Sequence, residues 1–468
     1  MSSNSLIEQF TSIVGDWGVV TDPSDLEPYC TDWRGMFKGA ALCVVLPRTT
    51  TEVAAIVKAC AAAKATLVPH GGNTGLSGGA TPDASGSQVV LSLARMAAIR
   101  AIDAVGETME VEAGCILQVA QEAAAERDLL LPISLAAEGS ARIGGILATN
   151  AGGTNVLRYG MARGRVLGLE VVTADGEIVS GLRQLRKDNA GYDWKQLFIG
   201  TEGTLGIITA AVLQLSPMPR HKVTAMLAVA SPADALKVLT AARREIGETL
   251  NAFELMSGAS VAMVVDHLGI ALPTAEAQWY VLLEASSALS GVRAGVELML
   301  EQAFERGEAV DGVIAESERQ EAELWNIRES ITECESRAGR SVKHDVSVPI
   351  SAIPAFLDQA SEAVLQAWPA ARLNAFGHVG DGNIHFNVIV PPDLDGLALN
   401  RLVHDVVVRH GGSISAEHGI GQYRVSEMVR CRSVAEVGLA LRVKRALDPH
   451  NLMNPGKVLP LSMMEEQS

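Results

Sequence analysis

The chain is poor in aromatic residues and in basic charge, and it has no long apolar run. Only 4% of its 468 residues are aromatic while 48% are hydrophobic, so small and aliphatic side chains must form most of the core. The formal net charge of −16 argues against nucleic acid as a partner and against a polybasic membrane anchor. No apolar stretch reaches the roughly 20 residues of a membrane-spanning helix, so we do not expect the chain to span a membrane.

Cysteine is scarce and scattered. The chain has six cysteines, and no two of them form a C-x-x-C pair. This spacing argues against a disulfide framework and a thiolate metal site, and it predicts reduced thiols. Residues 1–20 contain Glu8 and Asp16 but no Lys or Arg, which argues against a signal peptide or an Arg-rich transit peptide. We therefore expect a cytoplasmic location.

The expected elements indicate an α+β protein of several domains. Before residue 218 we expect helices at 49–63 and 115–127 and strands at 66–68, 89–93 and 108–112, in mixed sheets. Glycine becomes less frequent after Ser216-Pro217-Met218-Pro219, which marks a domain boundary. Beyond it, we expect strands with helices on one face of the sheet. These strands are expected at 224–229, 279–283, 374–378 and 383–390, and the helices at 233–246, 291–305, 353–368 and 397–409.

Three glycine-rich blocks lie before that boundary, at Pro69–Gly79, Ile143–Gly153 and Ile199–Gly206. Backbone N–H groups in such turns form concave anion sites, so three blocks together predict a large phosphate-bearing cofactor. A single block would more simply be an ordinary tight turn. The chain has neither a P-loop nor a Rossmann fingerprint with its acidic partner, which disfavours a nicotinamide cofactor.

Histidines gather in the last hundred residues. His378 and His385 flank a Gly-Asp-Gly-Asn turn between two strands that are expected to pair, and Glu417 follows on a separate loop. Two imidazoles and a carboxylate are typical ligands of a catalytic divalent metal with open positions. His418 is expected to point elsewhere and to act as a general base. The alternative is a set of surface or hydrogen-bonded core histidines.

A third group of residues could bind an anion. Arg328 and Thr332 are one helical turn apart, so we expect them to share a helix face, and Lys343 follows. Arginine can bind a carboxylate through two parallel hydrogen bonds. The alternative is a solvated helix with Arg328 and Glu329 in surface ion pairs.

These motifs together resemble the FAD-linked D-2-hydroxyacid dehydrogenases, which are flavoproteins of the vanillyl-alcohol-oxidase type. The resemblance runs from about Ala41 to Leu459. It is carried by Pro69–Gly75, Asn150–Gly153, Arg158–Gly160, Asn189–Gly206, Gly377–His385, Glu417–Gly421 and Asn454–Lys457. It implies a two-subdomain FAD-binding domain at residues 1–218 and an α+β substrate (cap) domain at 219–412. A short C-terminal helical segment at 413–468 would pack back on the FAD domain.

The resemblance also implies roles for individual residues. His378, His385 and Glu417 would bind the metal, with Zn favoured over Mn or Co, and His418 would be the base. Arg328, Thr332, Lys343 and Asn387 would contact the substrate. Non-covalent FAD would be bound by Pro69, Gly71, Gly72, Asn73, Thr74, Gly75, Ser77, Gly78, Gly144, Gly145, Thr149, Asn150, Gly152, Gly153, Gly160, Glu202, Gly203, Gly206, Ile207 and Asn454.

The implied reaction is oxidation of a small anionic D-2-hydroxy acid to the 2-oxo acid, with hydride transfer to flavin N5. D-2-hydroxyglutarate is the favoured substrate, and D-lactate or glycolate are alternatives. Electrons would pass to an electron-transfer flavoprotein or to quinone, and the protein is expected to be a homodimer. Three residues depart from the family pattern: His70 replaces glutamine or arginine, His344 replaces tyrosine, and Ala416 replaces glycine. Two alternative hypotheses come from other functional classes: a flavin-free metallohydrolase and a non-catalytic subunit of a larger complex.

Overall fold

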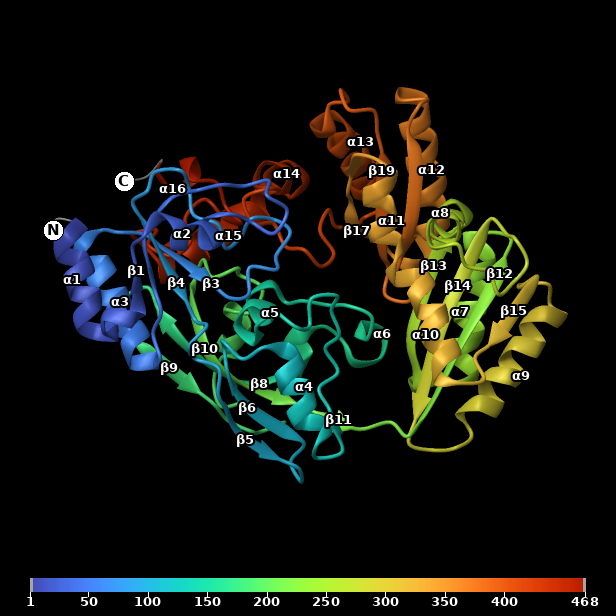
Figure 1. Ribbon diagram of the computed structural model, residues 1–468, viewed down its shortest axis with the longest axis horizontal. Coiled ribbons are helices and arrows are strands. Elements are labelled where there is room, and N and C mark those ends of the chain that lie inside the picture. Colours follow the sequence, from blue (N-terminus) through green and yellow to red (C-terminus); the bar gives the residue numbers. More distant parts are fainter. Residues whose placement is uncertain (1–2, 466–468) are drawn as a thin grey trace. The chain divides into compact units, whose positions relative to one another are not determined.

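The computed structural model describes residues 3–465, which form two compact units (Figure 1). Unit 1 comprises the chain up to Gly152, the segment Met161–Pro217 and the chain from Glu417 onward. Unit 2 comprises Gly153–Gly160 and Met218–Ala416. The short segment Gly153–Gly160 therefore leaves the second glycine block and joins the other unit.

The first sheet of unit 1 is mixed, as predicted. Its strand order is β1-β2-β4-β3, in which β2, β4 and β3 are parallel and β1 is antiparallel to β2. The strands are β1 (Val19–Val20), β2 (Ala41–Val45), β3 (Leu67–His70) and β4 (Gln88–Ser92). The associated helices are α1 (Ser3–Val14), α2 (Pro23–Cys30) and α3 (Thr50–Ala63). Helix α3 begins after the N-cap Thr49, whose side chain accepts a hydrogen bond from the Glu52 N–H.

The second sheet of unit 1 is antiparallel, with the order β5-β6-β10-β8-β9. Its strands are β5 (Ile99–Asp103), β6 (Thr108–Glu112), β8 (Val166–Thr173), β9 (Ile178–Gly181) and β10 (Gly206–Gln214). A two-stranded pair is formed by β7 (Leu129–Leu130) and β11 (Ser216–Pro217). The remaining helices of the unit are α4 (Leu117–Ala125), α5 (Ile143–Thr149), α14 (Val425–Cys431), α15 (Val434–Leu447) and α16 (Ser462–Glu465).

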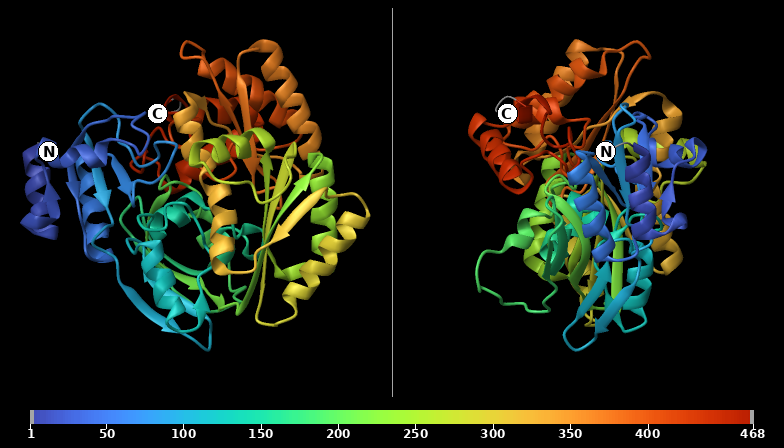
Figure 2. Two further views of the ribbon diagram at one scale, coloured as in Figure 1. Left: turned by 45° about the vertical axis from the view of Figure 1, so that its right-hand side comes forward. Right: turned by 90° about the vertical axis from the view of Figure 1, so that its left-hand side faces the viewer.

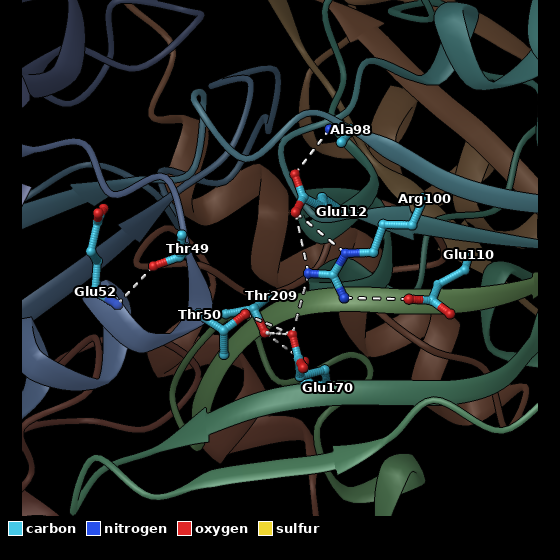
Figure 3. A network of polar contacts seen from close by, with 9 residues as sticks. All are labelled: Thr49, Thr50, Glu52, Ala98, Arg100, Glu110, Glu112, Glu170 and Thr209. Carbon is cyan, nitrogen blue, oxygen red and sulfur yellow. Dashed lines mark hydrogen bonds and ion pairs between the residues drawn. The ribbon is translucent and has the colours of Figure 1, made fainter.

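A single hydrophobic core joins the two sheets of unit 1, and a polar cluster reinforces the junction. Figure 3 shows Glu170 of β8 accepting hydrogen bonds from Thr50 of α3 at 2.7 Å and from Thr209 of β10 at 3.0 Å. Arg100 of β5 lies 3.6 Å from the same carboxylate and also pairs with Glu110 and Glu112. A buried carboxylate is tolerated only when it is paired and hydrogen-bonded, so this cluster ties α3 to the second sheet.

Unit 2 is built on a large antiparallel sheet with the order β15-β12-β14-β13-β18-β19-β16, and β17 also pairs with β19. Its strands are β12 (His221–Val229), β13 (Leu250–Ser257), β14 (Trp279–Ser287), β15 (Asp311–Ile314), β16 (Ser341–Val342), β17 (Asp345–Ser347), β18 (Arg372–Gly377) and β19 (Asn383–Ile389). The helices are α6 (Val156–Tyr159), α7 (Pro232–Glu245), α8 (Gly258–Leu268), α9 (Val292–Glu305), α10 (Glu318–Glu329), α11 (Ile331–Ala338), α12 (Ile353–Ala367) and α13 (Gly396–Arg409).

The expectation of helices on one face of this sheet is wrong, because helices cover both faces (Figure 2, left). Val281 and Leu283 of β14 belong to the core under α7, α9, α12 and α13. The alternate residues Tyr280 and Leu282 belong to a second core under α8, α10 and α11. Successive side chains of a strand point to opposite faces, so a strand that is apolar throughout requires a cover on each side.

The predicted α+β class is confirmed, and each expected element is present with its ends shifted by a few residues. Short 3₁₀ helices occur at Asp16–Gly18, Ala162–Arg165, Trp194–Leu197, Gly247–Thr249 and Ile350–Ala352. Among residues 3–465, no helix is both long enough and apolar enough to cross a bilayer. No disulfide joins any of the six cysteines, all of which lie within residues 3–465.

Candidate active site

The three glycine blocks of unit 1 converge on one another. In the third block, the N–H groups of Gly200 and Glu202 donate to the carbonyls of Leu147 and Ala148 in the middle of the second block, at 3.0 and 2.8 Å. The first block lies beside the second, because a Cβ on Gly71 would lie 3.5 Å from the Cα of Gly145, and a Cβ on Gly72 would lie 2.2 Å from the carbonyl oxygen of Ser140, just before the second block. Blocks that are far apart in the sequence therefore form one backbone-rich surface, and Gly72 leaves room for the backbone that precedes the second block.

This surface suits a phosphate-bearing cofactor. Within residues 3–465, the backbone N–H groups of Gly71–Gly75 donate no hydrogen bond to the chain, and they follow one another around a tight turn. Asn73 adopts a left-handed conformation there (φ 54°), and its amide donates to the carbonyls of Pro28 and Thr31. Consecutive N–H groups without protein acceptors are the donors that a pyrophosphate needs, so the first block fits the cofactor that was predicted for it.

Two buried side chains beside these blocks also have polar atoms without a partner. Asn454 donates from Nδ2 to the carbonyls of Gly79 and Glu202, but its Oδ1 has no partner within the described residues. Neither ring nitrogen of His70 has a hydrogen-bond partner of normal geometry there. Burial lowers the pKa of His70 to about 4, although the Gly71 backbone partly opposes this effect. Buried polar atoms are nearly always paired, so these atoms fit contact with a bound cofactor.

The predicted base lies on a loop that is bound to the cofactor blocks. Ser77 of the first block donates to the carbonyl of His418 at 3.1 Å. Glu202 of the third block accepts hydrogen bonds from the N–H groups of Ile420 and Gly421, at 2.7 and 2.8 Å. The carboxylate of Glu202 thus contacts the Glu417–Gly421 loop, and its predicted contact with the cofactor stays a prediction. Both Glu417 and His418 are partly exposed, so both are accessible to ligands.

In unit 2, the two predicted metal ligands lie together. His378 follows β18 and His385 lies in β19, opposite Phe376 of β18. Their ring centroids are 5.5 Å apart. Gly377, at φ 153°, permits the turn, because a Cβ there would lie 2.6 Å from the carbonyl oxygen of Asn383. The turn between paired strands thus brings both imidazoles within reach of one ion.

Sequence reasoning missed Glu254, a fully buried residue in the middle of β13. Its carboxylate lies 2.6 Å from Nδ1 of His378 and accepts a hydrogen bond from Nε of Arg328 at 2.7 Å. Burial by itself would raise the pKa of Glu254, but the charges and hydrogen bonds of His378 and Arg328 outweigh it and lower the pKa to about 2. A lone acidic residue inside the apolar run Ala252–Met256 was the available signal.

Ala416, the last residue of unit 2, is bound to the strand that pairs with the histidine hairpin. The N–H of Ala416 donates to the carbonyl of Asp345 at 3.1 Å. Asp345 lies opposite His385 in the β17–β19 ladder, and its carboxylate is 3.7 Å from Nδ1 of His385. Glu417, the third predicted ligand, is the next residue of the chain and belongs to unit 1. Sequence reasoning also missed Asp345.

The predicted substrate residues of unit 2 differ in their surroundings. Arg328 is buried at the end of α10, whereas Thr332 is exposed in α11, because one helix ends at Glu329 and the next begins at Ile331. The expectation that they share a helix face is therefore wrong. The Lys343 ammonium lies 3.9 Å from the buried carboxylate of Glu335. Asn387 donates to that carboxylate at 2.7 Å and accepts a hydrogen bond from the His344 N–H.

The remaining predicted cofactor residues belong to both units. Pro69, Thr74 and Gly78 lie in unit 1 with the other residues of the first block, and Gly144, Gly145, Thr149, Asn150 and Gly152 with the second. Gly203, Gly206 and Ile207 also lie in unit 1. Gly153 and Gly160 flank α6 in unit 2, where Arg158 donates to Asn251 at 2.7 Å and to Ser286.

Two families match this chain, and the second match begins at residue 218, where unit 1 gives way to unit 2. The family described as FAD binding domain matches residues 41–181, and the family described as FAD linked oxidases, C-terminal domain, matches residues 218–458. The solved structure of p-cresol methylhydroxylase with substrate bound has a TM-score of 0.76 at 18% identity and covers 98% of this chain and 97% of that chain. At that identity the likeness shows a shared fold.

Curated relatives cover almost the whole chain. A D-2-hydroxyglutarate dehydrogenase of Xanthomonas citri pv. viticola is 41% identical over 94% of this chain and 93% of its own length. The mitochondrial D-2-hydroxyglutarate dehydrogenase of Bos taurus is 40% identical over 94% of this chain and 81% of its own length. The cytoplasmic location stays a prediction, since the bovine relative is named as mitochondrial. The family matches, these identities and the converging glycine blocks lead to one conclusion: the chain belongs to the FAD-linked D-2-hydroxyacid dehydrogenases and is an FAD-dependent oxidoreductase.

Proposed function

We propose that the chain oxidises D-2-hydroxyglutarate to its 2-oxo acid, with FAD bound by unit 1 and with unit 2 contributing the substrate-binding side chains. The observation that carries the proposal is the attachment of the Glu417–Gly421 loop to the glycine blocks through Ser77 and Glu202. This attachment lies within a single unit, and it brings the proposed base His418 to the blocks that would bind the flavin. The names of the curated relatives support the choice of substrate.

The residues of the chain have separate tasks in this proposal. When bound, FAD supplies the acceptor for the C2 hydrogen and its two electrons, and a divalent metal polarises the 2-hydroxyl group. His378, His385 and Glu417 would bind that metal, with Zn favoured and Mn or Co as alternatives. His418 would accept the proton of the 2-hydroxyl group, since a neutral imidazole suits this role near pH 7. Oxidation would thus transfer the proton of the 2-hydroxyl group to His418 and the C2 hydrogen, with its electron pair, to FAD.

The substrate would be contacted by Arg328, Thr332, Lys343 and Asn387, and the two cations, Arg328 and Lys343, would bind its carboxylates. Arg328 uses only Nε for Glu254, and within the described residues its Nη1 and Nη2 groups make no hydrogen bond. That leaves one edge of the guanidinium for a bidentate carboxylate contact. Arg328 faces the buried carboxylate of Glu254, and Lys343 faces that of Glu335. Each positive charge is therefore partly neutralised by the protein itself. Binding would therefore depend on directed hydrogen bonds more than on net attraction.

A substrate panel tests the proposal. The purified protein should be yellow, with flavin absorbance, and should reduce an artificial dye with D-2-hydroxyglutarate at a higher kcat/KM than with D-lactate, D-malate or glycolate. Preference for D-lactate would favour the alternative within the family. A protein without flavin would contradict the cofactor assignment, and a flavin-containing protein that turns over none of these acids would favour a non-catalytic subunit.

The proposal also covers the electron acceptor, the oligomeric state and the cellular location. Electrons would leave the flavin for an electron-transfer flavoprotein or a quinone, the protein would be a homodimer, and it would work in the cytoplasm. Dye reduction followed by trials with each natural acceptor class tests the first, and sedimentation of the FAD-bound protein tests the second.

A further inference from the structure

We infer that Glu254 is a positioning residue that orients a metal-binding imidazole and a substrate-binding guanidinium at once. One carboxylate oxygen contacts Nδ1 of His378 at 2.6 Å, and the other accepts from Nε of Arg328 at 2.7 Å. The inference rests on the proposed function, because it takes His378 as a metal ligand and Arg328 as a substrate contact.

The contact with His378 selects the tautomer of its ring. An ionised carboxylate can only accept hydrogen bonds, so Nδ1 of His378 must carry the hydrogen. Glu254 also faces the Arg328 guanidinium at 2.7 Å, and a carboxylate paired with a permanent cation is ionised. The lone pair of the ring then resides on Nε2, the nitrogen that does not face Glu254. A carboxylate behind a metal-binding imidazole also raises the basicity of the ring and prevents its rotation.

The contact with Arg328 orients the guanidinium plane. Nε is bound to Glu254, and the guanidinium carbon lies 4.8 Å from the ring centroid of Phe376. A planar group that is held at one edge and stacked on one face keeps few orientations. Phe376 also contacts the ring of His385, with centroids 5.0 Å apart, so the same aromatic ring lies beside the second proposed ligand.

Because Glu254 is buried, its replacement should affect the orientation of both His378 and Arg328. Glu254, His378 and Arg328 are exposed by 0%, 8% and 8%, so water does not readily replace a lost partner. Glu254 lies on β13, which pairs with β18, the strand that leads directly into His378. The strand pairing therefore places the carboxylate beside the imidazole by backbone geometry, whereas Arg328 reaches it from α10 on one face of the sheet.

The test uses Glu254→Gln in the FAD-containing protein after removal of bound metal with a chelator. Titration with Zn²⁺ or Co²⁺ should show a 10–100-fold loss of affinity, as is usual for loss of a carboxylate behind a metal ligand. The KM for D-2-hydroxyglutarate should rise in the same variant, while the flavin content stays that of the wild type. Glu254→Asp, which keeps the charge but shortens the side chain, is the second variant and guards against a failure of Glu254→Gln to fold.

Glu284→Gln is the matched control. Glu284 lies on the neighbouring strand β14 and accepts hydrogen bonds from Asn251 and Trp325, but no hydrogen bond joins it to His378 or Arg328. Its replacement should leave both the metal affinity and the KM within twofold of the wild type. In an Arg328→Ala background, Glu254→Gln should still weaken metal binding but should no longer change the KM, since only the guanidinium carries that effect.

The outcomes separate the inference from the proposed function. A wild-type protein that binds no divalent ion would remove the proposed metal site itself. If the wild type binds the ion and both Glu254 variants fold with unchanged metal affinity and unchanged KM, the positioning role is overturned while the metal site stands. An equal loss of affinity in Glu284→Gln would also overturn it, because the effect would then belong to general damage of the sheet.

Discussion

Replacing Glu202 should disorder the Glu417–Gly421 loop and slow the reaction of the flavin-bound protein. The Glu202 carboxylate accepts hydrogen bonds from the Ile420 and Gly421 N–H groups at 2.7 and 2.8 Å. Glu202→Ala would leave both amides without this acceptor, and each unsatisfied amide costs about 1–3 kcal/mol, or roughly 2–6 kcal/mol for the loop. Glu202→Gln keeps one acceptor oxygen, so it should lose about half of that.

The consequence for catalysis follows from the position of His418 in the same loop. A displacement of about 1 Å at a catalytic group can reduce the rate about 100-fold, so kcat should fall in the order wild type, Glu202→Gln, Glu202→Ala. The assay is kcat per bound flavin, with flavin content measured by absorbance. Hydrogen exchange at the Ile420 and Gly421 amides, followed by mass spectrometry, reports the order of the loop directly.

Glu170→Gln provides the control for loss of a hydrogen-bonded carboxylate elsewhere in unit 1. Glu170 accepts hydrogen bonds from Thr50 and Thr209, which lie outside the Glu417–Gly421 loop. Its replacement should lower the melting temperature but leave kcat per flavin unchanged. The reasoning is refuted if Glu202→Ala keeps wild-type kcat per flavin and wild-type protection of the two amides.

Three other predictions concern stability, proton transfer and the metal. Burial lowers the pKa of His70 from 6.5 to about 4. As the pH falls from 7 to 4, the flavin-free wild type should therefore lose roughly 3 kcal/mol more free energy of unfolding than His70→Gln, measured by urea titration. Equal losses in the two proteins would contradict this prediction. His418→Ala should reduce kcat by about 100–10,000-fold with FAD retained, and near-normal turnover would remove the base assignment. Chelation should abolish dye reduction, and Zn²⁺, Mn²⁺ or Co²⁺ should restore it; indifference to chelation would argue against a catalytic metal.

The sign of the His70 effect follows from its low pKa in the folded state. Between pH 6.5 and about 4, the unfolded chain binds a proton at this residue that the folded protein does not. The contribution to stability is therefore complete above pH 6.5 and is lost as the pH falls. Glutamine has no such proton, so the difference between the two proteins isolates the histidine.

Local patterns in the sequence predicted most helices and strands, because helix-capping residues and the spacing of apolar residues reflect interactions between residues that are close in the chain. The end of α10 was not predicted, since Ser330 separates two helices without a proline or glycine to mark the break. Strand β13 was also missed, because it is buried on both faces and its sequence has no alternation for a period to reveal. Its single carboxylate, Glu254, gives no sign in the sequence of the two partners, His378 and Arg328, that it has in the structure.

The sequence by itself determined the α+β class, the three glycine blocks, the short turn that brings His378 and His385 together, and the family. These features depend on local backbone chemistry or on motifs that can be read directly. Only the tertiary structure decided the partners: Glu202 and Ser77 on the Glu417–Gly421 loop, Glu254 between His378 and Arg328, and Glu335 beside Lys343. Buried charges select their partners by position in three dimensions, and sequence separation carries almost no information about that position.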